Sequence, residues 1–208
     1  LWVSLEQGNL DQNVKCEPAM QRLTVRRYLS LSAESLSVPE SERPELLIWP
    51  ETAMPFDYQT APELSAAIRA FARFGAPGFR NRGDGVVDAF NRAYLIAPNG
   101  VGEGWYDKEH LVLFGEYVPP FLDLPFLRPL LQGVGEFLPG ESTGPLVLPA
   151  TPQLSPDRGP LVLGVLICYE SIFPELARKQ VAQGATLLVN ISNDAWFGRS
   201  SAPEQHLS

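Results

Sequence analysis

Short runs of apolar residues alternate along the chain with segments in which apolar positions recur at helical spacing. Each run has the length of a strand. Near-continuous apolar strands are typical of a sheet that is covered on both faces or packed against another sheet. We therefore expect strands at residues 1–5, 46–49, 94–96, 146–148, 161–167 and 187–191.

Three segments have the spacing of amphipathic helices. They are 18–36, 62–74 and 174–183. The second begins with a capping box of Thr60 and Glu63 and is followed by Gly75, a common helix-stop residue. The expected apolar faces consist of Met20, Leu23, Tyr28 and Leu31 in the first helix and of Phe173, Leu176, Ala177, Gln180 and Val181 in the third. Strands that alternate with helices predict the α/β class.

The segment 119–160 contains ten prolines, which predicts mostly loop around the short strand at 146–148. Long loops in compact domains are often functional. A surface excursion without function is the alternative.

Composition narrows the function classes. The chain has 208 residues, enough for one domain with a sizeable core, and its net charge of −8 argues against nucleic acid as the main partner. No run of about 18 apolar residues occurs, so we expect no membrane-spanning helix within it. The chain begins with Leu, has no signal peptide and stops without a terminating pattern, so we expect a piece of a longer protein.

Cysteine and histidine are too few for a disulfide scaffold or a typical metal site. Cys16 and Cys168 allow at most one disulfide, and His110 and His206 have no zinc-like spacing to either cysteine. We expect no metal.

Polar and reactive residues follow three of the apolar runs. The runs lead, in order, to Glu51, to residues 168–170 and to residues 192–194. In α/β folds, sites gather at the carboxyl ends of strands, so we expect these residues to lie together.

Cys168 is the candidate nucleophile, because the oxyanion formed by attack of a strand-end thiol can be met by the following backbone N–H groups. The residue type alone favours a buried, unreactive cysteine. Glu51 is a better candidate base than either histidine, since apolar surroundings raise the pKa of a carboxyl toward the operating range. A solvated strand-end glutamate is the alternative.

Lys108 is the candidate positive charge. Beside a thiolate it would lower the thiol pKa, and beside a tetrahedral intermediate it would stabilise the oxyanion. Most lysines are instead solvated. Glu116 and Glu170 could orient Lys108 or be solvated. We expect Cys168 to have a lowered pKa and to be alkylated faster than Cys16.

Four ordered motifs resemble the apolipoprotein N-acyltransferase family of the nitrilase superfamily. They are 49–53 (WPETA), 106–119 (YDKEHLVLFGEYVP), 167–170 (ICYE) and 190–198 (NISNDAWFG). The stretch 114–119 and the fourth motif are specific to that family among nitrilase relatives. Residues 7–10 (QGNL) also fit.

The resemblance implies catalytic roles for three residues and matches four supporting residues. Glu51 would be the general base, Lys108 the oxyanion stabiliser and Cys168 the nucleophile. Four supporting residues match by position. Glu116 would support the lysine, and the Tyr169 N–H would help form the oxyanion hole. Glu170 matches the second residue of the pair that follows the cysteine in the family, and Asn91 matches an asparagine that precedes a strand.

The implied fold is the nitrilase α-β-β-α sandwich, as one domain over residues 1–208 that is truncated at its C-terminal end. The implied reaction transfers an acyl chain from a phospholipid, through a thioester on Cys168, to the N-terminal diacylglyceryl-cysteine amine of apolipoproteins. No cofactor is implied. The domain would lie on the periplasmic face of the bacterial inner membrane, anchored by helices outside this chain.

The chain departs from the family after residues 7–10, where Lys15 is followed by Cys16 and the family commonly has a tryptophan.

Two other functions are also compatible with the sequence. A soluble nitrilase-type amidase or nitrile hydrolase would use the same Glu51, Lys108 and Cys168. A non-catalytic lipid- or protein-binding module would keep the fold, and equal, slow alkylation of both thiols would support it.

Overall fold

The computed structural model describes residues 1–10, 18–54, 56, 74–81, 87–96, 102–119, 137–141, 144–149 and 159–193. Its elements are β1 (Val3–Leu5), α2 (Pro18–Ser35), the 3-10 helix η1 (Glu40–Glu42), β2 (Leu46–Ile48), β3 (Phe74–Asn81), β4 (Val87–Ile96), β5 (Gly102–Asp107), β6 (Leu146–Leu148), β7 (Leu161–Ile167), the 3-10 helix η4 (Cys168–Ile172), α4 (Pro174–Ala182) and β8 (Leu187–Ile191).

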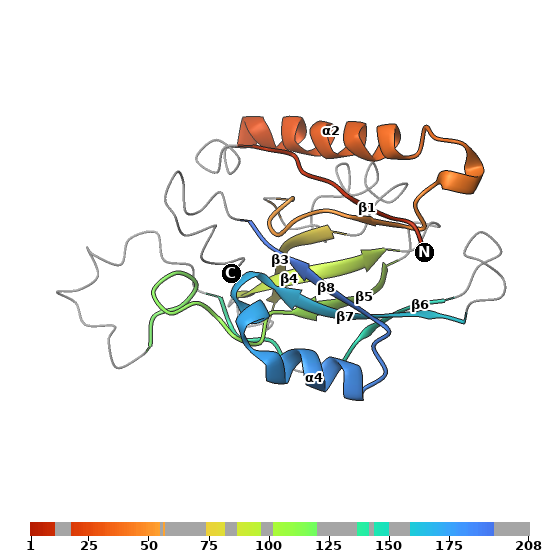
Figure 1. The fold of residues 1–208 in the computed structure, drawn as a ribbon. Coiled ribbons are helices and arrows are strands. Elements are labelled where there is room, and N and C mark those ends of the chain that lie inside the picture. The colour runs from red at the N-terminus through yellow and green to blue at the C-terminus, as the bar shows by residue number, and fades with distance from the viewer. Residues whose placement is uncertain are drawn as a thin grey trace.

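The strands lie in layers between helices α2 and α4 (Figure 1). β1 and β2 pair in parallel, β3-β4-β5 form an antiparallel sheet, and in β6-β7-β8 the first pair is antiparallel and the second parallel. Helix α2 lies on one side of the strands and α4 on the opposite side (Figure 1). The predicted α/β class is therefore confirmed, with strands between helices α2 and α4.

Two apolar clusters hold these layers together. The larger lies between the β3-β4-β5 and β6-β7-β8 sheets, and it includes Leu95, Tyr106, Val165 and Ile167. Its inward-facing side chains come from alternate positions of each strand, as packed sheets require. Cys168 belongs to this cluster, so the candidate nucleophile is attached directly to the core.

The second cluster joins α2 to the end of β2. The Trp49 ring stacks on the Tyr28 ring with centroids 5.1 Å apart, and the Trp49 indole N–H donates to the Ser32 hydroxyl at 2.9 Å. The Tyr28 phenol hydrogen-bonds the backbone of Gly8, where a Cβ would overlap the tyrosine ring. Close packing therefore requires glycine at position 8, within residues 7–10.

All six predicted strands are present, but the sequence pattern did not reveal β3, β5 or the first half of β4. β3 contains Gly75, Pro77 and Gly78, and β5 opens with Gly102 and Gly104, residues that normally indicate turns. The β4 residues before Tyr94 include charged side chains that pair across the sheet instead of forming an apolar run.

The helical predictions at 18–36 and 174–183 are confirmed by α2 and α4. The predicted faces are only partly right, because Leu23 and Val181 are about half exposed whereas Thr24 and Ser32 are buried. In the third prediction, residues 62–73 lie outside the described residues. Phe74 begins β3, so Gly75 lies in a strand and is not a helix stop.

Most of the proline-rich segment also lies outside the described residues, although β6 occurs where it was expected. Within the described part of the chain, no helix combines the length and apolarity needed to cross a membrane.

Candidate active site

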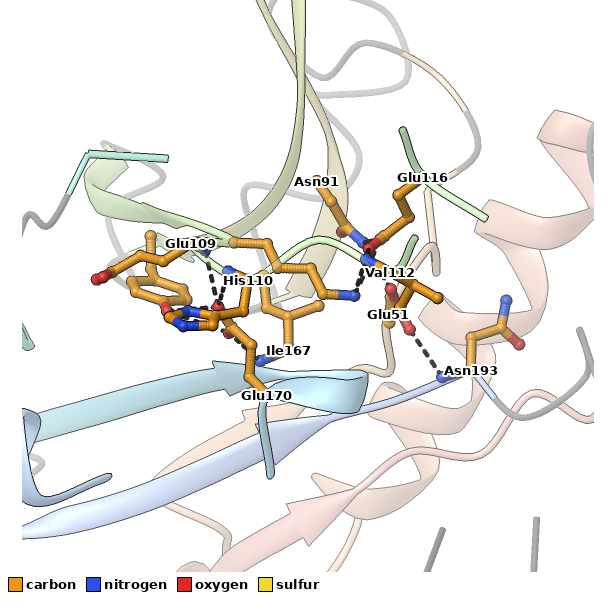
Figure 2. A network of polar contacts seen from close by, with 11 residues as sticks. Glu51, Asn91, Glu109, His110, Val112, Glu116, Ile167, Glu170 and Asn193 are labelled. Carbon is orange, nitrogen blue, oxygen red and sulfur yellow. Dashed lines mark hydrogen bonds and ion pairs between the residues drawn. The ribbon is translucent and has the colours of Figure 1, made fainter. Parts of the chain in front are cut away.

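Residues far apart in the sequence meet where β2, β5, β7 and β8 end. Glu51 follows β2, Cys168 follows β7, and Lys108 follows β5 directly. All three side chains are buried, with exposed fractions of 4%, 8% and 1%. Figure 2 shows Glu51, Asn91 and Glu116 pointing toward one another, with Glu170 in a neighbouring group of contacts.

Glu51 is held on both carboxylate oxygens. The Asn91 side-chain amide donates to its Oε1 at 2.6 Å, and the backbone N–H of Asn193 donates to its Oε2 at 3.1 Å. The Cys168 thiol is a further hydrogen-bond partner. Burial raises the pKa of Glu51, and the Lys108 charge and the Asn91 amide offset that effect only in part. Glu51 therefore has the electrostatic character of a proton acceptor beside a thiol.

Lys108 is a buried ammonium group with a fixed partner. Its Nζ lies 2.9 Å from Glu116 Oε1 and 2.8 Å from Glu116 Oε2. Burial acts to lower the Lys108 pKa, but the Glu51 and Glu116 carboxylates outweigh it, so the net pKa is raised. A positive charge is thus retained in a buried site, where it acts strongly on developing negative charge.

Glu116 accepts hydrogen bonds from two groups besides the Lys108 ammonium. The Asn91 amide donates to Oε1 at 2.7 Å, and the Val112 backbone N–H donates to Oε2 at 2.8 Å. One amide nitrogen of Asn91 therefore bridges Glu51 and Glu116. Of the two carboxylates proposed to orient Lys108, Glu116 is the one that does so.

Cys168 occupies a strained backbone position. Its φ of 54° lies in the left-handed region, which a residue with a side chain adopts only at an energetic cost. This conformation turns the chain sharply from β7 into η4. The Cys168 sulfur there accepts hydrogen bonds from the Ser192 side chain and the Tyr169 backbone N–H. That N–H is thus placed to donate to charge on or near the sulfur.

The expected lowering of the Cys168 pKa is wrong. Burial, followed by the Glu51 carboxylate, raises the pKa of the Cys168 thiol to about 11, although the Lys108 charge acts in the opposite direction. The expectation counted the lysine and neglected both desolvation and the negative charge of the base. The resting group is consequently a thiol, and its proton must leave as it attacks.

Glu170 closes the turn that carries Cys168. It is fully buried and accepts from the Glu109, His110 and Ile167 backbone N–H groups and from the Tyr106 phenol, at 2.7 to 3.1 Å. Burial nevertheless raises the pKa of Glu170. It thereby links the end of β7 to the segment that follows Lys108.

Ser192 and Asn193 lie at the site, as their position after the strand at 187–191 predicted, with the Asn193 N–H on Glu51 and the Ser192 side chain on the Cys168 thiol. The Tyr106 phenol, which donates to Glu170, was not predicted, because a tyrosine two residues before Lys108 carries no distinguishing signal. The His110 ring packs against the Phe173 ring in a tilted arrangement, with centroids 4.6 Å apart. Cys16 and His206 lie outside the described residues. Among those described, no group of three or more His, Cys, Asp or Glu side chains could hold a metal ion.

Solved structures share this fold at low sequence identity. An amidase from Nesterenkonia sp. superposes with a TM-score of 0.59 at 18% identity, covering 99% of this chain and 69% of that one. A carbon-nitrogen hydrolase from Helicobacter pylori G27 superposes with a TM-score of 0.52 at 20% identity, covering 83% and 55%. The nitrilase-type sandwich expected from the resemblance is therefore confirmed.

Sequence relatives are closer, and the resemblance to apolipoprotein N-acyltransferases is confirmed. The protein of that name from Geobacter metallireducens is 44% identical over 213 residues, covering 99% of this chain and 38% of that protein. The one from Bdellovibrio bacteriovorus is 34% identical, covering 91% and 36%. The chain thus spans well under half the length of these relatives. The sequence model described as Carbon-nitrogen hydrolase matches residues 24–208, and the chain therefore belongs to the carbon–nitrogen hydrolase family.

Proposed function

We propose that this chain is the catalytic part of an N-acyltransferase that moves an acyl chain from a phospholipid to the N-terminal diacylglyceryl-cysteine amine of apolipoproteins. The observation that carries the proposal is the meeting of Glu51, Lys108 and Cys168 in one buried site. The 44% identity to the Geobacter metallireducens apolipoprotein N-acyltransferase supports this reaction over others of the fold.

In the first half-reaction, the Cys168 sulfur attacks the carbonyl carbon of the phospholipid ester while Glu51 takes the thiol proton. The carbonyl oxygen becomes an oxyanion, which the Lys108 ammonium and the Tyr169 N–H stabilise. Collapse of this intermediate breaks the ester C–O bond. The departing alkoxide takes the proton from Glu51, so the products are lysophospholipid and a Cys168 thioester.

In the second half-reaction, the acceptor amine attacks the thioester carbonyl. Glu51 takes a proton from the amine, the C–S bond breaks, and the proton passes to the Cys168 thiolate. One base thus serves both steps, which requires a carboxyl that exchanges protons near neutral pH. The raised pKa of Glu51 supports this role.

Asn91 and Glu116 are proposed to hold the triad in place without reacting. Glu116 supplies the negative charge that keeps Lys108 protonated in its buried position. The Asn91 amide, which donates to both carboxylates, keeps Glu51 and Glu116 at a fixed separation. Glu170 is proposed to hold the turn on which Cys168 and the Tyr169 N–H lie.

We also propose that residues 1–208 form one domain of a longer protein, held on the periplasmic face of the bacterial inner membrane by helices outside this chain. The length of the relatives supports this arrangement, because the chain covers only 38% of the Geobacter metallireducens protein.

The test uses the full-length protein with phospholipid vesicles, and mass spectrometry detects acylated peptides. We expect an acyl adduct on the peptide that contains Cys168, its discharge by an N-terminal diacylglyceryl-cysteine peptide, and its absence in Cys168→Ala. Cys16→Ala is the matched control and should retain the adduct. Acyl transfer that survives in Cys168→Ala would refute the mechanism. Turnover of simple amides or nitriles without transfer to the peptide would support the hydrolase alternative.

A further inference from the structure

A buried ion pair lies directly beside the site but takes no part in the proposed chemistry. The Arg92 Nε donates to Asp107 Oδ1 at 2.5 Å, and an Arg92 terminal nitrogen donates to Asp107 Oδ2 at 2.8 Å. Both side chains are nearly inaccessible, with exposed fractions of 6% and 9%. Two parallel bonds of this kind fix the relative orientation of the two side chains as well as their distance.

Three aromatic rings and a glycine surround the Arg92 guanidinium group. Its Cζ lies 4.8 Å from the Trp105 ring centroid, 5.5 Å from that of Phe90 and 5.6 Å from that of Tyr94. A Cβ at Gly78 would overlap the Arg92 side chain, so glycine on the neighbouring strand leaves the space that Arg92 fills. Planar stacking on aromatic rings is a property of arginine that lysine lacks.

The pair is coupled to the site through the backbone. Arg92 and Asp107 are directly opposite each other in the β4–β5 ladder, and each is adjacent in sequence to a residue of the site, Asn91 and Lys108. Successive strand residues face opposite sides, so Asn91 projects from the other face of the sheet. The Lys108 N–H donates to the Asn91 carbonyl at 2.8 Å and continues the ladder.

The glycine-rich start of β5 specifies the register of this ladder poorly, so the register depends on the end of the strand, where Tyr106 is buried beside Asp107. The pairing shifts between Leu95 and Ile96, and β5 begins with Gly102 and Gly104, the latter at a φ of 152°. Glycines have no side chain to distinguish one face from the other, and a bulge allows the pairing to slip. In the described part of the sheet, β5 also has a neighbour on one side only.

We propose that Arg92 and Asp107 are a positioning pair that fixes the register of β5 against β4 and thereby presents Lys108 and Asn91 to Glu51, Glu116 and Cys168. The proposal rests on the proposed function for the roles of those residues. A slip of one residue would move Lys108 to the opposite face of the sheet. Register specification is the best-attested use of a buried ion pair, whose net contribution to stability is often small.

The test replaces the pair by apolar residues of similar size, in Arg92→Met/Asp107→Leu, so that no unpaired charge is left buried. Arg80→Met/Asp88→Leu is the control, at a pair in which the Asp88 side chain is buried and the Arg80 side chain is 59% exposed. Arg80 and Asp88 also pair across two strands at 3.2 Å, and Arg80 also stacks on Phe90, but neither residue is adjacent to the site. The readout is the rate of Cys168 alkylation by iodoacetamide across a pH series, followed by peptide mass spectrometry.

We expect alkylation of Cys168 in Arg92→Met/Asp107→Leu to slow by about tenfold at a given pH, because loss of the Lys108 charge would raise the thiol pKa further. The pH midpoint should rise accordingly, and the control should stay within about twofold of the wild type. If the apolar variant does not fold, Arg92→Lys, which keeps the charge without the two-pronged geometry, should show the same change in smaller degree.

An unchanged alkylation profile in a folded variant would overturn the proposal, as would an equal change in the control. Alkylation does not depend on the phospholipid or the apolipoprotein. A wild-type protein without acyl transfer but with the expected alkylation differences would therefore refute the proposed function and leave the positioning role supported.

Discussion

Replacing Glu51 by glutamine should change two properties of Cys168 in opposite directions. Glu51 is the second-largest cause, after burial, that raises the pKa of the thiol from 9.0 to about 11. That elevation leaves about a hundredfold less thiolate at neutral pH than an unperturbed thiol has. Glu51→Gln removes the carboxylate and keeps Lys108, which lowers the pKa, so part of the lost thiolate should return.

Since burial remains, the recovery must be smaller than the whole hundredfold. We expect alkylation of Cys168 by iodoacetamide to speed up by about tenfold in Glu51→Gln below the thiol pKa, which corresponds to about one pKa unit. Acyl transfer should slow by about a hundredfold or more, since the general base is lost. Peptide mass spectrometry across a pH series measures the first quantity, and acylation of a lipopeptide measures the second.

Glu109→Gln is the control. Glu109 is a nearby carboxylate bound to Lys179 at 2.8 Å, and it is not among the groups that set the Cys168 pKa. Both rates should stay near the wild-type values in this variant. If alkylation and acyl transfer fall together in Glu51→Gln, the carboxylate activates the thiol at rest, and the reasoning from electrostatic repulsion is refuted.

Two further predictions concern stability. Cys168→Gly should be more stable than Cys168→Ala by about 1 kcal/mol in urea denaturation, because glycine relieves the left-handed backbone at φ 54°; a glycine variant that is the less stable of the two would show that the turn is unstrained. Tyr106→Phe should lower the free energy of unfolding by about 1–3 kcal/mol, since the buried Glu170 carboxylate loses its phenol donor; an unchanged urea midpoint would mean that the backbone N–H groups suffice for Glu170.

The sequence predicted the site better than the fold around it. The prediction that Glu51 and Cys168 lie together needed only the rule that the carboxyl ends of strands meet in an α/β fold. The structure brings both residues together with Lys108. β3 and β5 were missed because their glycines and Pro77 are typical of turns, whereas in the folded chain these residues pair with β4. A local pattern carries no record of such partners.

The electrostatics of the site were also beyond the pattern. Nothing in the spacing of Glu51 and Cys168 indicates that both are desolvated together, and this burial makes the resting group a thiol. Likewise, the sequence offered both Glu116 and Glu170 as partners of Lys108. In the folded chain Glu116 pairs with the lysine, whereas Glu170 hydrogen-bonds the turn that carries Cys168. Burial and partner choice are properties of the packed chain.

The stacking of Trp49 on Tyr28 ties helix α2 to the segment that carries the base. Trp49 is two residues before Glu51, and its indole donates to Ser32 of α2. We therefore expect a displacement of α2 along its axis to move Trp49 and, with it, the backbone that carries Glu51. A selection for impaired variants should therefore recover changes on the inner face of α2, at a distance from every reacting atom.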